Sequence, residues 1–167
     1  MTVFIASQPI WFLYQAGTNG SSSASNSNLD LPEKFICFVG RASKEKGVHL
    51  IIEAFNSSNL KNTKLLIVGN TSADIDVKNY SENESIIFKH ELKNEDVKYL
   101  MSKSKAIVMG SISYEGHPVI LSESLASNTI LIYPSFSGLN ELMPSNYKFS
   151  YKHNNPNDLA KVLNLLE

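Results

Sequence analysis

Glu115 and Glu123 are the residues of this sequence whose types and spacing could do chemistry, two carboxylates separated by seven residues. Residues 106–109 have the apolar composition of a short buried strand, and Pro118 suits the first turn of a helix, where the N–H that proline lacks has no partner. We therefore predict Glu115 in the loop after the strand and Glu123 on the second turn of the helix. Ligands of open parallel sheets bind beyond the carboxyl ends of the strands, where a carboxylate can accept hydrogen bonds from the hydroxyls of a sugar. Alternatively, the two glutamates only add favourable charge around a helix start.

The elements that position these carboxylates follow a regular alternation from about residue 31 onward. Continuous apolar runs predict strands covered on both faces, and apolar stripes at i, i+3, i+4 and i+7 predict helices between them. Asn94 is expected to cap one helix, and Asn128 to end the helix of Glu123 in the left-handed conformation. Alternating strands and helices form right-handed βαβ units, so we predict an α/β fold with a doubly wound parallel sheet. The predicted strands are residues 35–39, 64–68, 85–88, 106–109, 129–133 and 148–151, and the predicted helices begin near residues 48, 94, 118, 139 and 156.

The first 28 residues do not follow this alternation. Residues 1–16 are largely apolar and contain the single tryptophan, Trp11, whereas residues 17–28 are rich in Gly, Ser and Asn, the composition of a flexible tether. We therefore divide the chain into an apolar arm with its linker, residues 1–28, and one domain, residues 29–167. The arm is either a leftover packing segment or a short strand that docks on a partner.

The composition excludes several classes of protein. The chain has 167 residues, of which 43% are hydrophobic and 19% charged, as in ordinary globular domains, and its net charge of −1 leaves no electrostatic footprint for nucleic acid. The single cysteine, Cys37, provides no disulfide framework and fits a reducing cytoplasm. The four histidines are scattered and we identify no Asp-x-Asp metal motif, so we expect no metal. No apolar run reaches the ~20 residues of a membrane helix, and no signal peptide is recognisable.

The stretch Tyr-Glu-Gly-x-Pro-x-x-x-x-Glu, from Tyr114 to Glu123, resembles the E-x7-E signature of the retaining family-4 glycosyltransferases, which have the GT-B fold. The resemblance covers about residues 35–166. It implies a Rossmann-like donor-binding domain that uses a nucleotide-diphospho-sugar, in the synthesis of a polysaccharide or glycolipid. By the same resemblance, Glu115 contacts the donor sugar and Glu123 the ribose of the nucleotide.

Gly40-Arg41 and Lys46-Gly47 match a second element of that family, which follows its first strand at the same spacing. Negative charge builds on a nucleoside diphosphate as it leaves, and two fixed cations beside a helix N-terminus stabilise that charge. The resemblance therefore implies that Arg41 and Lys46 act in catalysis together with Glu115. Both cations could instead belong to a solvated loop, but their place at the carboxyl end of a strand favours the phosphate role.

Weaker matches and departures complete the resemblance. Gly69 stands where the family has a glycine after its second strand, and Gly116 lies within the sugar-binding stretch. His90 replaces a family glycine near the nucleotide base, which leaves the identity of the base open. His117 stands where the family often has an aromatic residue, and we prefer a packing or sugar-contact role over a catalytic one. We assign these four residues, with Gly40 and Glu123, to the nucleotide-sugar site.

GT-B enzymes carry an acceptor-binding domain before the donor-binding one, and residues 1–28 cannot replace it. We therefore expect a donor-binding domain whose acceptor domain is on another chain or lost, and which transfers no sugar by itself. A non-catalytic sugar-nucleotide-binding module or partner subunit would use the same residues. The expected location is the cytoplasm, either free or at the inner face of the membrane, reached through a partner or by peripheral contact.

Two further α/β functions are disfavoured. A dinucleotide-dependent oxidoreductase would carry Gly-x-Gly-x-x-Gly after its first strand, which residues 39–43 lack. A receiver domain would carry an acidic cluster at its first strand, where this chain has Arg41.

Overall fold

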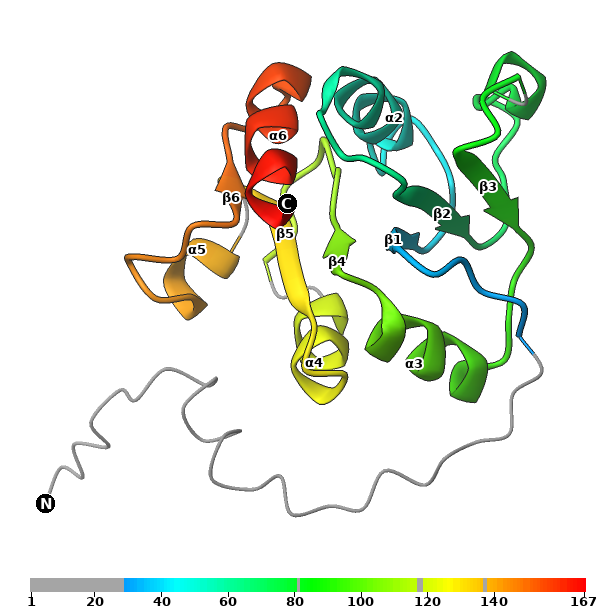
Figure 1. The fold of residues 1–167 in the computed structure, drawn as a ribbon. Coiled ribbons are helices and arrows are strands. Elements are labelled where there is room, and N and C mark those ends of the chain that lie inside the picture. Colours follow the sequence, from blue (N-terminus) through cyan, green and yellow to red (C-terminus); the bar gives the residue numbers. More distant parts are fainter. Residues whose placement is uncertain (1–28, 81, 117–118, 137) are drawn as a thin grey trace, which may run out of the picture.

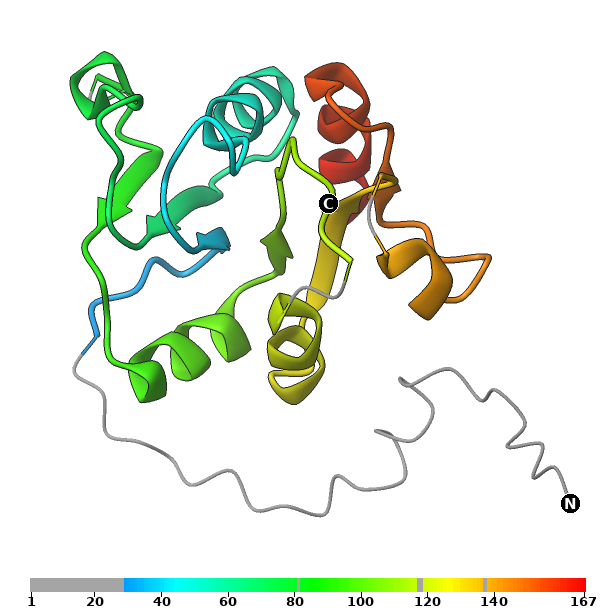
Figure 2. The same ribbon diagram turned by 180° about the vertical axis from the view of Figure 1, so that it is seen from behind.

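The computed structural model describes residues 29–80, 82–116, 119–136 and 138–167, so the predicted arm and linker, residues 1–28, lie outside the described part. Within the described ranges, six strands form one parallel sheet in the order β3-β2-β1-β4-β5-β6, with helices on both faces (Figures 1 and 2). The chain runs outward from β1 to β3, returns to the centre at β4, and runs outward again to β6. This order confirms the predicted doubly wound α/β fold, and its reversal between β1 and β4 marks the crevice where such sheets bind ligands.

The predicted elements recur with small shifts at their ends. The strands are β1 (Phe35–Val39), β2 (Lys64–Val68), β3 (Ile86–Lys89), β4 (Ala106–Val108), β5 (Ile130–Pro134) and β6 (Ser150–Tyr151). The α-helices are α2 (Val48–Ser57), α3 (Asn94–Lys103), α4 (Val119–Ala126), α5 (Leu139–Leu142) and α6 (Pro156–Leu163), and two 3-10 segments are η1 (Val77–Tyr80) and η2 (Asn164–Leu166). In the described ranges no helix has the length and apolar character needed to cross a membrane.

Each face of the sheet packs against its own set of helices. Ile36 and Phe38 of β1 point to the face covered by α2 and α6, whereas Phe35 and Cys37 point to the face covered by α3, α4 and α5. All four are buried, which is why the strand reads as one continuous apolar run. Burial raises the pKa of the Cys37 thiol to about 12, so this cysteine is a packing residue.

The asparagines of the helix ends behave differently from one another. Asn128 has a φ of 51°, which confirms the predicted left-handed end of α4. The prediction that Asn94 caps α3 is wrong, because the helix already begins at Asn94 and the residue before it, Lys93, is the cap and makes no side-chain cap bond. The Lys93 carbonyl accepts the first helical hydrogen bond, from the Val97 N–H. At α6, the Asn155 side chain caps the helix by accepting from the Asp158 N–H.

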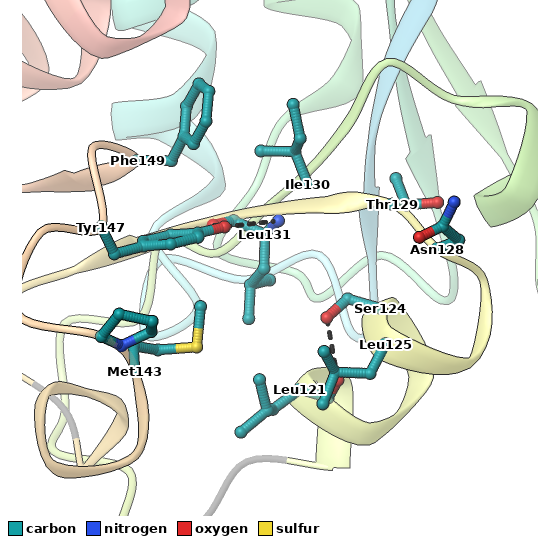
Figure 3. Close-up of a pocket in the computed structure, with 11 residues that line it drawn as sticks. Leu121, Ser124, Leu125, Asn128, Thr129, Ile130, Leu131, Met143, Tyr147 and Phe149 are labelled. Atoms are coloured by element: carbon teal, nitrogen blue, oxygen red, sulfur yellow. Dashed lines mark hydrogen bonds between the residues drawn. The ribbon is translucent and has the colours of Figure 1, made fainter. Parts of the chain in front are cut away.

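The outer edge of β5 is closed in two ways along its length. The short strand β6 pairs only with Tyr133 and Pro134. Nearer the start of β5, the Tyr147 hydroxyl accepts a hydrogen bond from the Leu131 N–H (3.2 Å) and donates one to the Leu131 carbonyl (2.8 Å), as Figure 3 shows. Burial raises the pKa of Tyr147 to about 12, so the hydroxyl keeps the proton that it donates. A mainly apolar cavity of about 280 Å³ lies beside this ring, between α4 and residues 143–149.

Tyr147→Phe should lower the free energy of unfolding by about 1–3 kcal/mol, because it leaves both backbone groups of Leu131 without their partner in a half-buried place. Urea unfolding followed by circular dichroism measures this change. Tyr99→Phe is the matched control, because this ring on α3 makes its contact with Lys103 through its face. An equal loss of stability in both variants would show that the hydroxyl of Tyr147 does not support the edge.

Candidate functional site

The loops that follow β1 and β4 meet at the carboxyl edge of the sheet, at the reversal of strand order. The Ile112 N–H donates to the Glu45 carbonyl over 2.9 Å. Gly47 has a φ of 66°, and a Cβ atom at this position would collide with the Gly110 carbonyl group. Only glycine therefore allows the two backbones to approach so closely. The approach brings side chains of distant parts of the sequence into one site.

Lys46 and Glu115 form an ion pair at this junction. Lys46 Nζ donates to Glu115 Oε1 over 2.7 Å, and 37% of the lysine and 24% of the glutamate side chain are exposed. The Ser111 hydroxyl, on a residue only 5% exposed, donates to the same oxygen. Glu115 Oε2 has no hydrogen-bond partner within the described residues. One oxygen of the carboxylate is therefore held by the protein, and the other can accept a hydrogen bond from a ligand.

The surroundings of Glu115 favour its charged form. Partial burial raises the pKa of Glu115, but the hydrogen bonds from Lys46 and Ser111 and the charge of Lys46 outweigh this effect, so its pKa lies below the ordinary value of 4.5. At neutral pH the carboxylate can therefore only accept hydrogen bonds. The Lys46 ammonium group has three N–H donors and can hold Glu115 and an anion at the same time. The pair thus offers an acceptor for hydroxyls beside a cation for phosphate.

Arg41 lies in the same loop as Lys46 but has another partner. Its guanidinium donates to Glu45 Oε2 over 3.1 Å, and both side chains are mostly exposed. An exposed pair of this kind contributes about 0–1 kcal/mol, so a diphosphate could displace Glu45 from Arg41 at little cost. The sequence places both cations after β1, and the structure adds that each is paired with a carboxylate.

The predicted ribose and sugar residues lie around the start of α4. Glu123 is on this helix, as predicted, and is partly exposed. Gly116 lies against the next loop, because the Gly138 N–H donates to the Glu115 carbonyl over 2.9 Å and a Cβ at Gly138 would collide with the Gly116 carbonyl. His117 lies outside the described residues. The structure therefore brings the loops after β4 and β5 together at Glu115.

Gly40, Gly69 and His90 follow β1, β2 and β3, so they lie at the same edge of the sheet as Lys46. The strand order places Gly69 and His90 on the side of Lys46 that is away from Glu115. Gly69 has a φ of 135°, and a Cβ at this position would collide with the Gly40 carbonyl, so the backbone itself explains the glycine. His90 is exposed and is not in contact with the Lys46–Glu115 pair.

Asp74 and Asp76 have the Asp-x-Asp spacing of many metal-binding sites, so the prediction that this pattern is absent from the chain is wrong. Both carboxylates instead accept hydrogen bonds from backbone N–H groups: Asp74 from Lys44 (2.9 Å) and Asp76 from Lys78 (3.1 Å). The bond from the Lys44 backbone is the main cause that lowers the pKa of Asp74. Within the described residues, no group of three or more His, Cys, Asp or Glu side chains could hold a metal ion.

Sequence reasoning missed Ser111 as a partner of Glu115. A serine directly after an apolar strand is typical of a turn residue, and nothing in the local pattern shows that its hydroxyl points at a carboxylate four positions on. The cavity beside Tyr147 contains none of the predicted site residues.

Comparison with protein families identifies the domain type. The family model described as glycosyl transferases group 1 matches residues 22–167. An uncharacterized glycosyltransferase of Methanocaldococcus jannaschii is 28% identical in an alignment of 120 positions, which covers 66% of this chain and 30% of that protein. The chain therefore spans about a third of the length of this relative.

Solved structures show the same fold at low sequence identity. HepE of Anabaena, in complex with UDP and glucose, matches with a TM-score of 0.68 and 16% identity, over 80% of this chain and 38% of that one. The C-terminal domain of LpcC, a glycosyl transferase group 1 family protein of Francisella tularensis, matches with a TM-score of 0.70 and 20% identity, over 81% of this chain and 75% of that one. At these identities the likeness establishes the fold.

The Lys46–Glu115 pair should make stability depend on pH in the acid range. Because the folded-state pKa of Glu115 is lower than its unfolded value, the pair stabilises the fold above about pH 4.5 and loses this contribution as the pH falls through the folded pKa. The free energy of unfolding of the wild type, minus that of Glu115→Gln, should be constant near neutral pH and shrink on acidification. Urea unfolding between pH 7 and pH 3 measures it.

Glu33→Gln is the control, since Glu33 is exposed and has no ion-pair partner in the described part of the chain. A difference between the wild type and Glu115→Gln that does not change with pH would contradict the lowered pKa.

Proposed function

Because the chain belongs to the glycosyl transferases group 1 family, we propose that residues 29–167 bind the nucleotide-diphospho-sugar donor of a retaining glycosyltransferase. The observation that supports this proposal is the Lys46–Glu115 pair, in which a cation and a hydrogen-bond acceptor lie side by side at the reversal of strand order. A diphospho-sugar needs both groups, at neighbouring positions. Synthesis of a polysaccharide or glycolipid on the cytoplasmic side of a membrane is the process that we propose for the whole enzyme.

The proposed roles follow from the chemistry of the leaving group. When the bond between the sugar and the diphosphate breaks, its electron pair stays on the diphosphate, and Lys46 and Arg41 stabilise the added charge without a divalent metal. Glu115 orients the sugar through its free oxygen, Oε2. Glu123 holds the ribose, and the edge formed by Gly40, Gly69 and His90 receives the base. UDP is the first nucleotide to test, because HepE of Anabaena was solved with UDP.

Lys46→Ala should weaken UDP binding about 5- to 150-fold, since it removes a charge-assisted hydrogen bond worth about 1–3 kcal/mol. Isothermal titration calorimetry in the presence of EDTA measures the dissociation constant and tests the metal-free proposal in the same experiment. Lys44→Ala is the matched control, because Lys44 lies in the same loop and contributes a backbone hydrogen bond to Asp74. Equal affinity of the wild type and Lys46→Ala, or UDP binding that EDTA abolishes, would refute these roles.

Glu115→Gln should strengthen the binding of UDP and reduce the additional affinity for UDP-glucose. Removal of the negative charge frees Lys46 for the diphosphate, whereas the amide is a weaker acceptor for a sugar hydroxyl than a carboxylate. The same calorimetry with UDP and with UDP-glucose separates the two effects. Glu123→Ala, in contrast, should weaken the binding of both UDP and UDP-glucose, because both ligands contain the ribose. An unchanged preference for UDP-glucose in Glu115→Gln would exclude the sugar contact.

A further inference from the structure

Three rings form a continuous aromatic surface beside Glu115. We define the aromatic surface as Tyr114, Phe136 and His153, which come from the loops after β4, β5 and β6. The Tyr114 and Phe136 rings meet edge to face, with centroids 5.7 Å apart, and the Phe136 and His153 rings lie tilted at 4.5 Å. His153 Nε2 is 2.7 Å from the Ile112 carbonyl, which fixes the imidazole on the loop of Glu115.

This surface is open to solvent, which is unusual for aromatic rings that could pack. Tyr114 is 59% exposed and Phe136 is 49% exposed. Of the large apolar side chains in the described ranges, only Val119 and Leu165 are comparably exposed. A single exposed apolar residue needs no explanation, but rings in mutual contact at the rim of a site indicate a ligand or a partner.

The chemistry of the surface fits a sugar ring. Aromatic faces carry partial negative charge and attract the polarised C–H groups on the apolar face of a pyranose. Because the Ile112 carbonyl can only accept, His153 Nε2 is the donor of their hydrogen bond, and Nδ1 of the neutral ring is an acceptor for a hydroxyl. Glu115, next to Tyr114, adds a charged acceptor. Aromatic rings accompanied by hydrogen-bond acceptors have the composition of a carbohydrate subsite rather than of a purely apolar docking patch.

The position of the surface places it beyond the proposed sugar contact. Along the carboxyl edge of the sheet, the cations follow β1, Glu115 follows β4, and the rings extend from β4 across β5 to β6. The aromatic surface therefore lies on the side of Glu115 away from the cations. We propose that it is a pyranose-binding subsite that extends the donor site, an inference that rests on the proposed function for the location of the diphosphate. The pyranose belongs either to the donor or to a glycoside acceptor.

Nuclear magnetic resonance of the aromatic side chains tests this directly, with three probes added in turn to the whole chain. UDP alone tests the proposed function, UDP-glucose adds the donor sugar, and methyl glycosides of glucose, galactose and mannose added to the UDP-bound protein represent the acceptor. Shifts at Phe136 and His153 that appear with UDP-glucose and not with UDP support a donor pyranose. Shifts that appear only with a methyl glycoside support an acceptor pyranose. Shifts with a glycoside when UDP fails to bind support the subsite and count against the proposed function.

Phe136→Ala should weaken the binding of the sugar that causes these shifts roughly three- to tenfold and leave UDP binding unchanged. Phe136→Trp should restore the affinity for that sugar. Leu165→Ala is the matched control, because it removes an equally exposed apolar side chain from η2. The proposal is overturned if no sugar shifts the resonances of the rings while UDP binds, or if Phe136→Ala binds the sugar as tightly as the wild type does. It is also overturned if these resonances shift only with protein concentration, because the surface would then be a contact between copies of the chain.

Discussion

The close approach of two backbones at Gly47 and Gly110 is the constraint on which the candidate site depends. Without a Cβ atom at Gly47, the loop after β1 can rest on the loop after β4, and the hydrogen bond from Ile112 to Glu45 fixes their register. Lys46 is the residue before this glycine, so its side chain reaches Glu115 from the neighbouring strand. A larger residue at position 47 would separate the loops and thereby the two charges, although neither charged residue had changed.

The fold could be read from the sequence because its signals are local. Continuous apolar runs predicted the strands, because strands that are buried on both faces have apolar residues at every position. Pro156 predicted where α6 begins. The common edge of Arg41, Lys46 and Glu115 followed from the order of strands and helices. The pairing of Lys46 with Glu115 did not follow, because no local pattern records a contact across 69 positions. The same applies to Ser111 and to the aromatic surface, whose rings come from three separate loops.

The ion pair also bears on how selective the site would be under the proposed function. With Lys46 bonded to Glu115, the ligand-free pair carries no net charge, so a simple anion that bonds to a remaining N–H of Lys46 is also repelled by the neighbouring carboxylate. A diphospho-sugar offsets this repulsion, because its hydroxyls donate hydrogen bonds to Glu115 while its phosphates approach Lys46. A ligand that bonds to both Lys46 and Glu115 is therefore favoured over a ligand that bonds only to Lys46.

The Tyr147 hydroxyl has a consequence for how the domain behaves among other copies of itself. An outer strand with free N–H and carbonyl groups is a template onto which another extended chain can add, and this is a common start of aggregation. Here β6 covers only the end of β5, and one phenol occupies both groups of Leu131 where a longer strand would otherwise be needed. Solubility at this edge therefore depends on a side chain rather than on strand length, and loss of that one hydroxyl group would expose a short segment capable of intermolecular β-sheet growth.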